Sequence, residues 1–134
     1  MASYPTKRTP DQRDFLDLTI TTAADGLSEV GDLGGLRVAG VEMSTAWTAA
    51  DLSFKGSPLT SAAMYDVYRV ADSTAPALYQ LGTTANRIIG FNSQAFDGLR
   101  FIQLQSLAAG GSTAAEQAAA RTLRLLLAPP GPIK

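Results

Sequence analysis

Alternation of apolar and polar residues with a period of two is the feature that most constrains the fold of this chain. In the segment FLDLTITTA (15–23), Leu18 and Ile20 fall on one face, whereas Asp17 and Thr19 fall on the other. Successive side chains of a β-strand point to opposite faces of a sheet, and β-branched residues are common in strands. The segment is therefore predicted to be a strand with one buried face.

Segments of this kind recur along the chain at the short spacings that are typical of sandwiches and barrels. Gly40 lies inside one of them, where a glycine indicates a bulge or a closely approaching backbone. A turn or single helical turn is predicted over 44–51, and a one-turn helix over 92–98. The predicted strands are 15–23, 36–43, 52–57, 64–70, 78–82, 86–91, 99–107 and 120–128.

The C-terminal region fits two different structures. The segment STAAEQAAARTLRLLL (112–127) is rich in alanine, which favours a helix. Leu123, Leu125 and Leu127 recur with a period of two, and this pattern and the two prolines that follow favour a strand instead. We predict a closing strand over 120–128 that follows a loop over 108–119. A helix over 112–122 stays open as the alternative.

Together these elements predict an all-β fold. No βαβ spacing is present, and about eight short, mostly antiparallel strands fit a two-sheet, jelly-roll-like sandwich. The chain has 134 residues, of which 46% are hydrophobic, so it can bury a core without disulfides or metals. The predicted organisation is an extended basic arm over 1–13, a sandwich domain over 14–130 and a short tail over 131–134.

The composition argues against several classes of function. The chain contains no histidine and no cysteine, which removes the usual general base at neutral pH and thiolate chemistry. A Ser-His arrangement is therefore impossible, and we expect no enzyme activity, no catalytic residues, no cofactor and no metal. The net charge of −1 argues against nucleic acid as a partner. No run of about 20 apolar residues, the length needed to cross a bilayer, is present, so a membrane role is not expected.

Acidic residues are the remaining candidates for metal binding. Asp25, Glu29 and Asp32 lie in or beside the glycine-rich segment DGLSEVGDLGG (25–35), where carboxylates commonly cap turns. Their oxygens would also suit a hard cation such as Ca²⁺, although the spacing matches no EF-hand loop. Turn formation is the favoured interpretation.

Aromatic side chains are the candidates for carbohydrate binding, because sugar-binding sandwiches often use exposed rings. Trp47 and Tyr79 are the possible ligand-facing residues. Tyr65 and Tyr68 are three positions apart, so on one strand they would face opposite sides and could not form a single platform. Trp47 is better suited to plug one end of the sandwich, because one large ring beside two strands typically fills a core, and ligand binding is the alternative.

The N-terminal segment has a different character from the rest of the chain. Residues 1–13 hold few apolar side chains, and Lys7, Arg8 and Arg13 against Asp11 give a local charge of 3 − 1 = +2. Such a segment cannot pack as a core element. We predict an arm that becomes ordered against a neighbouring subunit, with the three cations as partner-binding residues. A frayed terminus is the alternative.

Three stretches of the sequence resemble a known group of proteins. They are DLGGLRVAGVEMSTAWTAADLSFKGS (32–57), RIIGFNSQAFDGLRFIQLQS (87–106) and AAARTLRLLLAPP (118–130). They are similar to small β-sandwich virion proteins of tailed bacteriophages, of the capsid decoration or head-fibre-associated type. The chain departs from the group at SPLTSAAMYDVYRV (57–70), where members carry a longer hairpin, and at its basic arm.

This resemblance implies a structural role in the virion. We expect a capsid decoration or cement protein on the exterior of the head, made in the host cytoplasm and assembled into the virion. The implied partners are the major capsid protein or other virion subunits, and a homo-oligomer, with a trimer favoured. The alternatives are a receptor- or carbohydrate-binding module of a head fibre or tail, and an adaptor between capsid and fibre.

Overall fold

The computed structural model describes residues 15–69, 75–91 and 95–129, which form eleven strands and no helix. Every pairing between these strands is antiparallel, so the predicted all-β class is confirmed. No helix in these ranges could cross a membrane. The predicted arm (1–13) and tail (131–134) lie outside the described residues. The strands are β1 (Phe15–Ile20), β2 (Gly31–Asp32), β3 (Arg37–Glu42), β4 (Ala50–Ser57), β5 (Tyr65–Asp66), β6 (Tyr68–Arg69), β7 (Ala77–Leu78), β8 (Gln80–Thr83), β9 (Ile88–Gly90), β10 (Phe101–Leu107) and β11 (Arg121–Ala128).

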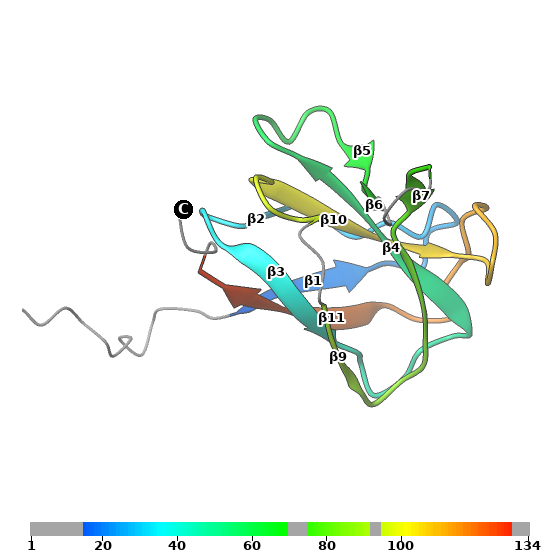
Figure 1. Ribbon diagram of the computed structural model, residues 1–134. Helices are drawn as coiled ribbons and strands as arrows, with labels where there is room; N and C mark the ends of the chain where they lie inside the picture. The colour runs from blue at the N-terminus through cyan, green and yellow to red at the C-terminus, as the bar shows by residue number, and fades with distance from the viewer. Residues whose placement is uncertain (1–14, 70–74, 92–94, 130–134) are drawn as a thin grey trace, which may run out of the picture.

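The first sheet, called sheet I here, has the strand order β1-β11-β3-β9. Strand β1, near one end of the described chain, pairs along its whole length with β11, near the other end, from Phe15 opposite Leu126 to Ile20 opposite Arg121. The hydroxyl groups of Thr19 and Thr122 lie 2.7 Å apart across this pair. Figure 1 shows sheet I as one layer of the molecule.

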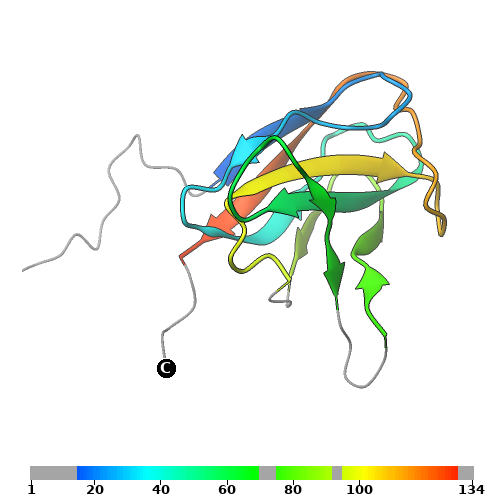
Figure 2. The same ribbon diagram turned by 90° about the horizontal axis from the view of Figure 1, so that it is seen from above.

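The second sheet, called sheet II here, has the order β2-β10-β4-β5, and β8 also pairs with β4. Strand β8 occupies the first half of the free edge of β4, and β5 occupies the second half. Strands β6 and β7, which follow β5 and precede β8 in the sequence, pair with each other as a separate two-stranded ribbon. The two views show sheet II lying over sheet I, as expected for a sandwich (Figures 1 and 2).

The core lies between the two sheets and is built from the alternating apolar residues. Each fully buried leucine, isoleucine or phenylalanine contributes about 1.5–3 kcal/mol relative to an exposed one. One end of the core is aromatic, with four rings in mutual contact at centroid distances from 4.9 to 5.8 Å. The buried strand residues are Leu18, Ile20, Val38, Val41, Leu52, Phe54, Ile102, Leu104, Leu123 and Leu125.

Most of the predicted strands are present, with small shifts at their ends: β1, β3, β4, β9, β10 and β11. The predicted strand 64–70 is broken into β5 and β6, because Val67 between them is buried and donates its N–H to the carbonyl of Phe54 at 3.0 Å. The predicted strand 78–82 is likewise divided between β7 and β8. The short strand β2 was not predicted.

The predicted helical turns are corrected by the structure. Of the predicted helix 92–98, residues 92–94 lie outside the described residues and 95–98 form turns, and the segment 44–49 is irregular. The segment 108–120 is also irregular, and β11 follows it. The prediction of a closing strand after a loop is therefore confirmed, and the helical alternative over 112–122 is wrong.

Gly40 has both properties that its position predicted. The register between β3 and β11 shifts beside it, which marks a bulge. A Cβ atom at this position would also lie 2.7 Å from the carbonyl oxygen of Ile89 on β9. The glycine therefore allows two backbones to approach more closely than any side chain would permit.

Candidate functional site

The two aromatic residues that were candidates for ligand binding belong to the core. Trp47 is half-buried, packs against the core and donates its indole N–H to the carbonyl of Ala50 at 3.1 Å, which agrees with its role as a plug. Tyr79 is only 6% exposed and contacts the rings of Phe54 and Phe96. The expectation that Tyr79 faces a ligand is therefore wrong. Burial raises the pKa of its phenol, and the nearby charge of Arg69 opposes this effect in part.

The carboxylates of the glycine-rich segment act in backbone structure. Asp25 and Asp32 each accept a hydrogen bond from the amide two residues further on, at 3.1 and 2.9 Å, as predicted for Asx-turns. Glu29 instead accepts the amide of Thr19 on β1 at 2.7 Å. No group of three potential metal ligands occurs among the residues that the structure describes. The predicted contact residues Lys7, Arg8 and Arg13 lie outside those residues.

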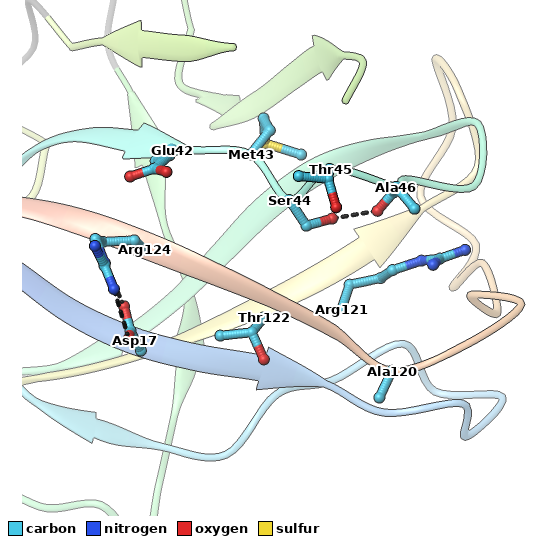
Figure 3. A pocket seen from close by; sticks show the side chains of 10 residues that line it. All are labelled: Asp17, Glu42, Met43, Ser44, Thr45, Ala46, Ala120, Arg121, Thr122 and Arg124. Carbon is cyan, nitrogen blue, oxygen red and sulfur yellow. Dashed lines mark hydrogen bonds and ion pairs between the residues drawn. The ribbon is translucent and has the colours of Figure 1, made fainter. Parts of the chain in front are cut away.

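An open cavity of about 420 Å³ lies on the outer face of sheet I (Figure 3). Strands β1, β3 and β11 contribute Asp17, Glu42, Thr122 and Arg124, and the loop 43–46 forms a second wall. Along β1 and β11, Asp17 and Arg124 alternate with buried leucines, so they point outward from the sandwich. The period-two pattern could indicate these outward positions, but not that the three strands are neighbours.

The floor of the cavity is held by an ion pair across β1 and β11. The guanidinium of Arg124 donates to both carboxylate oxygens of Asp17, at 2.9 and 3.3 Å (Figure 3). Arg124 also lies over the ring of Phe15, 4.2 Å from its centroid. The hydrogen bond that Arg124 donates to Asp17 is the main cause of the raised pKa of Arg124, and the negative charge of Glu42 adds to it.

A buried glutamine fixes the loops at one end of the cavity. Gln117 is fully buried, and its amide oxygen accepts the backbone N–H of Thr48 at 2.9 Å. Its amide nitrogen donates to the hydroxyl of Ser106 at 2.9 Å and to the carbonyl of Thr48 at 3.2 Å. Arg121 completes the network by donating to Gln117 at 3.3 Å and to the hydroxyl of Thr48 at 3.1 Å. The sequence does not indicate this network, because a glutamine in an alanine-rich segment gives no local signal of burial.

Three exposed apolar side chains lie on the segment between β4 and β7. Leu59, Tyr65 and Tyr68 are 83%, 67% and 54% exposed. The backbone that presents them is well anchored, because Ser57 accepts the amides of Leu59 and Thr60 and because Lys55 forms a 2.7 Å ion pair with Asp66. We call these three side chains the apolar surface. The break of the strand at Val67 exposes both tyrosines, which a continuous strand would not have done.

Comparison of the chain with known proteins finds a structural neighbour but no family. No family model and no curated protein match the sequence. Among solved structures, the crystal structure of the SPBc2 prophage-derived protein YomS is similar, with a TM-score of 0.45 and 11% sequence identity. The match covers 90% of this chain and 100% of that chain. The neighbour is prophage-derived, and at this level of similarity no functional argument rests on it.

Proposed function

We propose that this chain is a non-enzymatic structural protein of a bacteriophage virion, and specifically a decoration protein that stabilises the exterior of the capsid. The three sequence stretches that resemble phage virion proteins support this role. They include β3, β4, β9 and β11 and nearly all of β10. The proposed partner is the major capsid protein.

The observation that carries the proposal is the apolar surface. Three large apolar side chains stand out from an anchored backbone, and tyrosine is enriched where proteins bind one another. Their burial against a capsid subunit would release ordered water without requiring the backbone to change shape. We propose that Lys7, Arg8 and Arg13 add an electrostatic contact to acidic groups of the capsid.

We also propose that the protein assembles as a homo-oligomer, with a trimer as the favoured state. Several copies of a weak contact that engage one lattice together raise the overall affinity without any new contact. Sedimentation equilibrium of the purified protein would measure this state. A monomer at all concentrations tested would argue against it.

Binding to capsids stripped of the protein tests the proposal. The unmodified chain should bind, and the double variant Tyr65→Ser/Tyr68→Ser should bind about ten- to a hundredfold more weakly, as expected for two interface tyrosines. Ile88→Ser is the matched control, because Ile88 is an equally exposed apolar residue on sheet I. Removal of residues 1–13 should weaken binding most at low salt.

Two outcomes would contradict the proposal. Failure of the unmodified chain to bind capsids would overturn the decoration role and favour a receptor-binding module or an adaptor to a fibre. Full binding by the double tyrosine variant would show that the apolar surface is not the contact.

A further inference from the structure

We propose that the open cavity on the outer face of sheet I binds a neutral saccharide. This inference goes beyond the decoration role and does not depend on it, because the cavity shares no residue with the apolar surface. It also places carbohydrate binding at a different site from Trp47 and Tyr79, whose rings pack in or against the core.

The size and lining of the cavity suit a small polar ligand. Its volume of about 420 Å³ lies within the range of about 300–1,000 Å³ that is usual for small-molecule sites. Ala46 and Ala120 supply apolar contacts for the carbon face of a sugar ring, whereas the Met43 side chain belongs to the core. Thr45 and Thr122 supply hydroxyl groups beside them. An apolar wall next to convergent polar groups is the arrangement that binds a polyol in a fixed orientation.

The charges of the cavity favour an uncharged ligand. Its lining holds the two acids Asp17 and Glu42 and the two arginines Arg121 and Arg124, so the formal charges cancel. A charged ligand of either sign would therefore be repelled by two of these groups while it is attracted by the other two. A sugar hydroxyl both donates and accepts hydrogen bonds, so it can use carboxylate and guanidinium groups together.

The groups that hold the site in shape differ from those that are open to a ligand. Arg124 is held in place by Asp17 and Phe15, and Arg121 is held by Gln117 and Thr48. Binding of a ligand would therefore cost little conformational entropy in these two side chains. In contrast, the side chains of Glu42 and Thr45 are exposed and make no hydrogen bond to any side chain or backbone group within the described part of the chain. We infer that these two side chains make the first contacts with the saccharide.

The test is an NMR titration of the ¹⁵N-labelled full chain with single sugars. The probes are glucose, galactose, mannose, rhamnose and N-acetylglucosamine at up to about 50 mM, well above the millimolar Kd of a weak site. N-acetylneuraminic acid serves as the charged comparison. At least one neutral sugar should produce saturable shifts that are confined to the amides of residues 42–46 and 120–124.

Variants decide whether the cavity itself is the site. Glu42→Ala should weaken binding about tenfold, the change expected when one charge-assisted hydrogen bond is lost. Asp97→Ala is the matched control, since Asp97 is an exposed acid that lies outside the cavity, and its Kd should not change. The spectra of both variants report directly whether the fold is retained.

Three results would overturn the inference: no saturable shift with any neutral sugar, shifts centred on Tyr65 and Tyr68, or tighter binding of N-acetylneuraminic acid than of every neutral sugar. Binding of Glu42→Ala to stripped capsids should be unaffected. The saccharide site and the capsid contact can therefore fail independently of one another.

Discussion

At the scale of single residues, Tyr79 shows how tertiary contacts override a local pattern. From the sequence it was a candidate for an exposed ring. In the structure it joins Phe54, Phe91 and Phe96, which come from three other places along the chain. Such a cluster depends on contacts between distant segments, and period-two alternation contains no information about them.

Burial of Tyr79 makes stability depend on pH in the alkaline range. The pKa of its phenol is raised above 10.0 in the folded protein, so the unfolded chain loses this proton first. The contribution of Tyr79 to the free energy of unfolding is therefore intact below about pH 10 and falls as the pH rises through the folded pKa. Tyr79→Phe keeps the ring and should remove this part of the decline. Urea denaturation between pH 8 and 11 measures it.

The control for this experiment is Tyr65→Phe, because Tyr65 is exposed. It should keep the alkaline decline of the unmodified protein. Identical pH profiles for the unmodified protein and Tyr79→Phe would show that the buried phenol is not the cause.

At the scale of elements, alternation predicted which face of a strand is buried but not which strands are neighbours. The buried face of β1 agrees with the prediction, because alternation within one strand is a local property of the sequence. Ser53 of β4 is a polar residue between Leu52 and Phe54, yet it is buried and donates to the carbonyl of Gln105. The shared edge of β4 and the cavity between β1, β11 and β3 arise from pairings that a single sequence does not reveal.

The bulge of β3 gives a prediction at this scale. Gly40→Ala would place a methyl group 2.7 Å from the carbonyl oxygen of Ile89, so β9 would have to move away from β3. We expect a loss of about 1–3 kcal/mol in the free energy of unfolding, as for other overpacked sites. Gly90→Ala on β9 is the matched control, because its methyl group would meet no atom within 4 Å. Equal stabilities of the two variants in urea would contradict the close approach of these strands.

At the scale of the whole molecule, the two sheets share one core and should unfold together. Leu18→Ala removes a buried side chain from β1 and should cost about 2–5 kcal/mol. Because Trp47 packs against the same core, its fluorescence and the far-UV circular dichroism should show one urea transition. Both signals should shift equally in the variant. Leu59→Ala, at an exposed position, should leave the transition unchanged, and separate transitions for the two signals would show that the sheets unfold independently.

The pairing of β1 with β11 also bears on how the protein is made. Thr19 and Thr122 are 103 residues apart in the sequence, and β11 is the strand that joins β1 to the rest of sheet I. A ribosome synthesises β1 first and must produce nearly all of the described chain before its neighbour exists. Sheet I therefore cannot close during most of translation. An incomplete nascent chain would carry an open sheet edge, of the kind that chaperones and proteases recognise.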